Sequence, residues 1–186
     1  VFDATTCLSV RVWDDGNEEL PSDVQDEVYI IDEFDPDIPT FSILVNEDDL
    51  WDWDNGIYVM GPNAANDYPH FGANFWEPWS RFARMQFFDA EGTLQLRENM
   101  DLEIHGGWSR AEPQRSFRLD FKNEYTGNLE WPLFPDKPES VTFNNINLRN
   151  GGQHTWATKM QDALINRLAM RTHVVAGAWQ PAHLYL

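Results

Sequence analysis

The stretch IHGGWSRAEPQRSFRLDF, residues 104–121, decides the fold expected for this chain. Near its end, Phe117, Leu119 and Phe121 alternate with polar residues, and this period of two predicts a β-strand with one buried face. Residues 100–104 alternate in the same way, so we expect the two strands to pair across the intervening loop. The stretch therefore predicts an antiparallel sheet.

Further strands are expected on both sides of this pair. Asp89 to Gly92 supply a turn signal, so the segments on either side of it predict a hairpin. By contrast, the acidic segment 46–55 and the segment 61–79, which is rich in Pro, Asn, Gly and aromatic residues, are expected to be loops. The additional strands are predicted at residues 41–45, 81–88, 93–96, 174–175 and 183–186.

One main helix is predicted late in the chain, beginning after Thr155, which is suited to cap its N-terminus. Arg167 and Arg171 lie near its expected end, where the helix dipole favours cations. The apolar residues at helical spacing are Trp156, Met160, Ala163, Leu164 and Leu168. The expected fold class is α+β, mostly antiparallel sheet with this one main helix.

Residues 1–35 predict a separate unit before the main domain at residues 36–186. Segments 7–13 and 24–31 alternate and flank a turn, which predicts a β-hairpin, and its single Cys7 is expected to be a small buried residue. Two strands are not stable alone in water. The hairpin resembles the closing strands of the small β-sandwich at the C-terminus of chitobiase-like enzymes, which implies that most of such a sandwich precedes Val1.

The charge of the chain is unevenly distributed. Residues 1–67 hold 18 acidic residues and one basic residue, whereas residues 68–186 hold 13 acidic and 12 basic residues. This acidity disfavours nucleic acid as a partner, and no apolar run has the length of a membrane span. It favours either solubility outside the cell or calcium binding by Asp14, Asp15, Asn17, Glu18 and Glu19, or by Glu47, Asp48 and Asp49.

Several segments together resemble the CotH kinase family, whose members are related to spore-coat and surface-protein kinases. The similarity extends over residues 41–186 and implies an atypical protein-kinase-like N-terminal lobe in a secreted or cell-surface protein. The segments that carry it are residues 104–121, NEY at 123–125, PLF at 132–134, NLRNGG at 147–152, LWDWDNGIYVMGPN at 50–63 and FWEPWSRFARMQFFDAEG at 75–92.

A nucleotide site is predicted around the double glycine at Gly106 and Gly107. A Gly-Gly bend lets backbone amides approach an anion closely, and the arginines that follow, together with Lys122, supply positive charge. The alternative is a tight turn with solvated arginines. The predicted cofactor-binding residues are Gly106, Gly107, Ser109, Arg110, Arg115, Arg118 and Asp162.

The resemblance assigns two of these residues specific roles. Arg115 falls where the family usually has a Lys that contacts nucleotide phosphate, and Arg keeps that charge with a different geometry. Asp162 falls near an acidic helix position, and its pairing with Arg115 or Arg118 would be similar to the Lys–Glu ion pair of kinases.

The resemblance implies an enzyme that uses ATP and magnesium to phosphorylate Ser in surface or coat proteins. In the family, the metal-binding and catalytic Asp residues follow a segment that is similar to the end of this chain. We therefore expect catalysis to require residues outside this chain. The alternative is a structural or adhesive module that contacts neighbouring subunits. Arg115 and the acidic, aromatic-rich first half favour the module, and the IHGGWSR stretch favours the enzyme.

Other site chemistries are disfavoured. Ser109 is not in a G-x-S-x-G elbow, and the five His residues lack zinc-ligand spacing. Five Trp residues could form a sugar-stacking surface, although a place in the core is the usual one for Trp. These are Trp51, Trp53, Trp76, Trp79 and Trp108.

Overall fold

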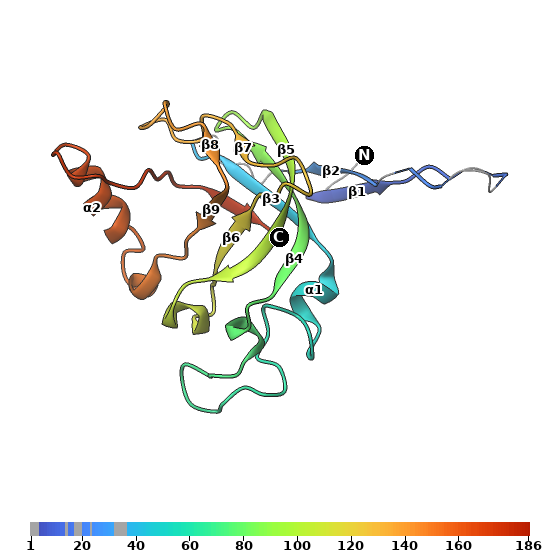
Figure 1. Cartoon of the computed structure of the whole chain (residues 1–186), viewed down its shortest axis with the longest axis horizontal. Helices are drawn as coiled ribbons and strands as arrows, with labels where there is room; N and C mark the ends of the chain where they lie inside the picture. The colour runs from blue at the N-terminus through green and yellow to red at the C-terminus, as the bar shows by residue number, and fades with distance from the viewer. Residues whose placement is uncertain (1–3, 14, 17–19, 23, 32–36) are drawn as a thin grey trace.

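The main body of the protein is a curled six-stranded sheet with strand order β10-β3-β4-β5-β6-β9 (Figure 1). The structure is a computed structural model and describes residues 4–13, 15–16, 20–22, 24–31 and 37–186. Every neighbouring pair in the sheet is antiparallel except β10 and β3. The strands are β3 (Thr40–Val45), β4 (Ser80–Phe88), β5 (Leu94–His105), β6 (Ser116–Asp120), β9 (Asn145–Leu148) and β10 (His183–Tyr185).

The predicted pairing of the two alternating segments is confirmed. Leu102 of β5 lies opposite Leu119 of β6, and Ile104 lies opposite Phe117. All four side chains are buried on the same inner face of the sheet, where they join the main core. Because side chains alternate between faces, a slip of one residue would expose this whole set, so burial determines the register. The architecture is mostly sheet with few helices, as expected.

The N-terminal hairpin consists of β1 (Thr6–Val10) and β2 (Gln25–Tyr29) and extends away from the sheet (Figure 1). Its β2 strand is tied to the polar outer face of the sheet. Asp26 pairs with Arg84 at 2.8 Å, and its carbonyl accepts a hydrogen bond from Gln86. Cys7 is exposed, so its predicted burial is wrong. The predicted domain boundary after residue 35 lies outside the described residues.

Two helices flank the sheet. The helix α1 (Glu47–Trp51) occupies part of the predicted acidic loop, because the side chain of Asn46 caps its start and three acidic residues lie in its first turn. The helix α2 (Gln161–Ala169) is shorter than expected and does not begin after Thr155. Lys159 has a φ of +56°, which is incompatible with a continuous helix through that position.

Short elements complete the fold. Residues 174–175 are not in a strand, contrary to the prediction, whereas the strand predicted near the end is confirmed as β10. The segment 61–79 is a loop, as expected, apart from one turn of 3-10 helix. The short elements are η1 (Asn74–Trp76), η2 (Trp108–Ala111), η3 (Gly152–His154), β7 (Leu129–Glu130) and β8 (Thr142–Phe143).

Candidate functional site

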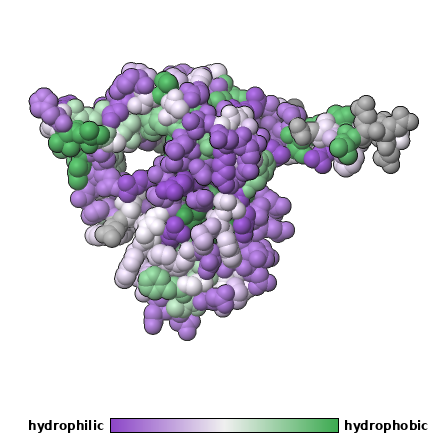
Figure 2. Space-filling model, viewed as in Figure 1, coloured by the Kyte–Doolittle hydropathy of each residue, from purple (hydrophilic) through white to green (hydrophobic). Residues whose placement is uncertain are grey.

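A cleft of about 590 Å³ lies between the inner face of the sheet and α2. An opening between the α2 segment and the body is visible in Figure 2. The apolar part of the cleft is formed by Phe41, Phe134, Ile146, Leu148 and Leu184. Its charged part is formed by Arg115, Arg149, Lys159 and Asp162. An apolar floor with a few converging charged groups is the usual composition of a small-molecule site.

An ion pair between Arg149 and Asp162 connects the end of β9 to α2. The distance from Arg149 Nη2 to Asp162 Oδ2 is 2.5 Å, and both side chains are about half exposed. The predicted acidic helix residue therefore pairs with an arginine, but its partner is Arg149, directly after β9, rather than Arg115 or Arg118. The ion pair links the two walls of the cleft.

Arg115 lies at the cleft with its guanidinium between two aromatic rings. The guanidinium carbon is 4.2 Å from the ring centre of Phe75 and 4.6 Å from that of Tyr58. Burial lowers the pKa of this guanidinium, although arginine keeps its charge in proteins. Its Nε is buried without a hydrogen-bond partner. The two rings and the contact from Nη1 to the Pro113 carbonyl at 3.4 Å hold the side chain in place.

The double glycine lies at the end of β5, away from the cleft lining. Gly106 has a φ of +122°, and a Cβ there would meet Ser109 Oγ at 2.7 Å, so the bend requires glycine. Arg110 donates from Nε to the Gly106 carbonyl at 2.7 Å and from Nη1 to the Phe75 carbonyl at 3.2 Å. Arg110 therefore supports the bend, while open space surrounds Gly107 where a Cβ would stand.

Arg118 lies on the face of the sheet opposite to Arg115. It stands across from Glu103 of β5. Burial lowers the pKa of the nearby His105, and the positive charges of Arg118, Arg110 and Arg149 lower it further. The polar face near the glycine bend is therefore electropositive.

The predicted site residues are divided by the structure. Arg115 and Asp162 both line the cleft, whereas Gly106, Gly107, Ser109, Arg110 and Arg118 lie outside it.

A buried polar network that the sequence analysis missed shapes the cleft wall. Asn150 is 3% exposed, and its side chain accepts a hydrogen bond from Ser116 Oγ and donates one to the carbonyl of Gln114. Its backbone N–H also donates to Ser116 Oγ at 3.0 Å. The next residue, Gly151, has a φ of +97°, and a Cβ there would lie 2.8 Å from Lys159 Cα. The Asn-Gly-Gly sequence after a strand was the available signal.

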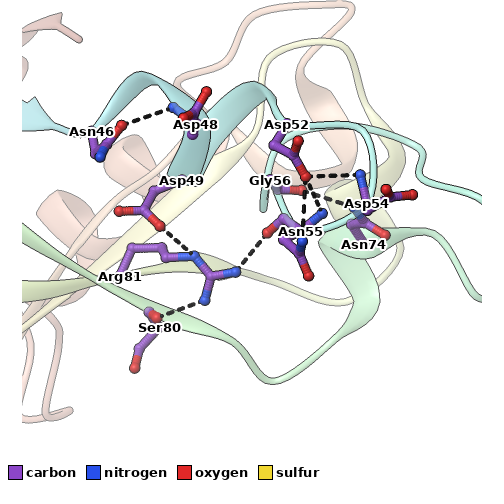
Figure 3. Close-up of polar contacts among 10 residues, drawn as sticks. All are labelled: Asn46, Asp48, Asp49, Asp52, Asp54, Asn55, Gly56, Asn74, Ser80 and Arg81. Carbon is purple, nitrogen blue, oxygen red and sulfur yellow. Dashed lines mark hydrogen bonds and ion pairs between the residues drawn. The ribbon is translucent and has the colours of Figure 1, made fainter.

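Two of the acidic residues near α1, Asp49 and Asp52, form side-chain contacts within the protein (Figure 3). Asp49 pairs with Arg81 at 3.1 Å, and Asp52 Oδ1 accepts the backbone N–H groups of Asp54 and Asn55. Within the described ranges, no group of three or more His, Cys, Asp or Glu side chains could hold a metal ion. Of the other predicted calcium loop, Asp14, Asn17, Glu18 and Glu19 lie outside the described residues.

The tryptophans are divided between surface and core. Trp51, Trp53 and Trp108 are at least half exposed, so their predicted burial is wrong. Trp76 and Trp79 are partly buried against the core, as expected.

In the part of the chain that the structure describes, helices long and apolar enough to cross a bilayer are absent.

Comparisons with known proteins found no matching family model, no matching curated protein and no matching solved structure.

Proposed function

We propose that this chain supplies the nucleotide-binding part of a CotH-type atypical protein kinase, within a secreted or cell-surface protein. The cleft between the sheet and α2 binds the nucleotide. The apolar floor receives the base, and the cationic wall receives the phosphates. The acceptor is a Ser residue of a surface or coat protein.

The observation that carries this proposal is the concentration of positive charge in an otherwise acidic protein. The chain has a net charge of −18, yet Arg115, Arg149 and Lys159 line one cleft. Asp162 is the single carboxylate among the residues described there. Phosphoryl transfer depends mainly on positioning and on stabilisation of phosphate charge, and such a wall suits that task.

The residues of the cleft would have different roles. Lys159 Nζ contacts Gln114 Oε1 at 2.5 Å, and both groups are exposed enough to rearrange around a phosphate. Arg115 is held by its rings and contributes a positive charge of fixed position. Arg149 would contribute positive charge to the phosphate site, and in the free protein it is paired with Asp162 of α2. Magnesium would arrive with the nucleotide, and the described residues offer no carboxylate cluster for it.

Calorimetry on the whole chain tests this proposal, with ATP, adenosine and inorganic triphosphate as titrants, each with and without magnesium. We expect ATP and triphosphate to bind and Lys159→Met to weaken both about tenfold, since one charge-assisted contact contributes about 1.5 kcal/mol or more. Arg171→Met removes an exposed cation of the same segment outside the cleft and should have no effect. Absence of binding heat with all three titrants would refute the proposal.

A second candidate function is a non-catalytic module that contacts neighbouring subunits in an extracellular assembly. The exposed apolar residues of α2 favour it, because Leu164, Ile165 and Leu168 are each more than half exposed. Figure 2 shows hydrophobic residues gathered at this end of the molecule. Sedimentation at rising concentration tests it, since self-association that Leu168→Glu abolishes is expected only of such a module.

A further inference from the structure

A cluster of aromatic side chains lies on the loop surface formed by residues 61–79 and by η2. It comprises Tyr68, His70, Phe71, Trp76 and Trp108, and we call it the aromatic cluster. The exposed fractions of Tyr68, Phe71 and Trp108 are 53%, 54% and 56%. These residues are distinct from those that line the cleft. Large exposed rings in mutual contact indicate a binding surface.

The rings of the aromatic cluster meet at steep angles. Phe71 and Trp108 are 6.2 Å apart at 88°, and Tyr68 and Trp108 are 6.1 Å apart at 65°. Because these pairs meet edge to face, several flat ring faces are left available for a ligand. The loop is also fixed by hydrogen bonds, since Trp76 Nε1 donates to the Pro69 carbonyl at 2.9 Å. The surface is therefore largely preformed.

Polar groups adjoin the rings, and the local charge is negative. The hydroxyl of Tyr68 donates to Glu112 Oε1 at 3.2 Å, which leaves the second carboxylate oxygen for a ligand hydroxyl. The loop 61–79 contains Asp67 and Glu77 and no Lys or Arg, and Glu112 follows η2, whereas the one cation of η2, Arg110, donates to the Gly106 and Phe75 carbonyls. A ligand with negative charge would be repelled by this surface.

We propose that the aromatic cluster binds a neutral polysaccharide. The C–H faces of pyranose rings stack on the exposed faces of Trp108 and Phe71, and sugar hydroxyls hydrogen-bond to Glu112 and to the Tyr68 hydroxyl. The combination of flat apolar rings with adjacent hydrogen-bonding groups matches the two kinds of surface on a sugar, whereas an apolar peptide would cover the second oxygen of Glu112 without giving it a donor. This inference does not depend on nucleotide binding in the cleft.

Affinity electrophoresis of the whole chain tests the inference. The soluble polysaccharides, mixed-linkage β-glucan and xylan, are included in native gels. The insoluble polysaccharides, cellulose and chitin, are used in pull-downs. Heparin serves as the anionic probe. We expect retention by at least one neutral polysaccharide and none by heparin. Trp108→Ala should weaken binding about tenfold, because one aromatic stacking contact contributes up to about that factor. Trp53→Ala removes a Trp that is 57% exposed outside the aromatic cluster and should change nothing.

Two results would overturn the inference. One is a folded protein that none of the four neutral polysaccharides retains, which leaves the aromatic cluster as a surface for a protein partner. The other is equal loss of binding in Trp108→Ala and Trp53→Ala. Glu112→Gln provides a second variant with less effect on packing, and it should weaken retention while circular dichroism stays unchanged.

Discussion

Arg149 and Asp162 form an ion pair with 2.5 Å between Nη2 and Oδ2. The pair connects the residue directly after β9 to the first turn of α2. The two residues are separated by twelve positions that contain η3 and several turns. The pair links the two walls of the cleft, so its properties bear directly on the proposed nucleotide site.

Asp162→Asn should leave stability nearly unchanged and strengthen ATP binding. Both side chains of the pair are about half exposed, and an exposed pair contributes about 0–1 kcal/mol to folding. Removing the carboxylate frees Arg149 and removes a repulsive charge beside the phosphates, so we expect about threefold tighter binding at low salt. Asp136→Asn, which removes a carboxylate near Arg167 outside the cleft, is the matched control. Weaker ATP binding would mean that the pair organises the site instead.

Arg115→Lys should destabilise the protein by about 1–2 kcal/mol, because an ammonium group cannot stack between Phe75 and Tyr58 as a planar guanidinium does. Urea unfolding followed by tryptophan fluorescence measures this change in the free energy of unfolding. Arg171→Lys is the control on an exposed arginine. An unchanged unfolding midpoint in Arg115→Lys would show that the ring contacts do not stabilise the fold.

Asp101→Asn should destabilise the protein at neutral pH and flatten its response to acid. Burial alone would raise the pKa of Asp101, but hydrogen bonds from Lys122 and Tyr125 outweigh burial and lower it below 3.8. The folded state therefore holds this proton less tightly than the unfolded chain, so the stabilisation is complete above about pH 5 and is lost as pH falls through 4 and below.

We expect Asp101→Asn to cost about 1–3 kcal/mol at pH 7, since the partner Lys122 is partly exposed. Urea unfolding at pH 7 and pH 3 provides the measurement, and the difference between variant and parent should shrink at pH 3. Glu98→Gln, at a carboxylate that contacts Thr126, serves as the control. A difference that persists undiminished at pH 3 would contradict the assigned charge interaction.

Asn150→Ala should be among the more destabilising polar substitutions, by about 2–3 kcal/mol, because it leaves the buried Ser116 hydroxyl and the Gln114 carbonyl without that partner. Thermal unfolding compares this variant with Asn144→Ala, which alters an exposed side chain on the same segment. The Asn150 variant should also bind ATP less well, since the 114–116 and 149–152 segments both reach the cleft. Equal unfolding temperatures for the two variants would argue against the network.

Some features of the site could be predicted from local sequence pattern, among them the opposite placement of Arg115 and Arg118. Arg115 directly precedes β6 and is three positions from Arg118, and because successive side chains of extended backbone point to opposite faces, the two were expected on opposite faces. The helix α1 was missed because its acidic residues were interpreted as a loop, although acidic residues in a first turn after an Asn cap favour a helix. The late start of α2 depends on the backbone around Gly151 and Lys159, which local periodicity does not reveal.

The sequence by itself determined the central strands of the sheet and which of their faces was buried. Alternation of apolar residues at 100–104 and 117–121 admits only one register that hides both sets from water. Only the tertiary structure decided that Asp162 met Arg149, that Arg115 entered an aromatic sandwich and that Arg110 supported the glycine bend. Long charged side chains interact with whichever groups lie near them in the folded protein. Folding brings these groups together from distant parts of the chain, so their spacing in the sequence shows no pattern.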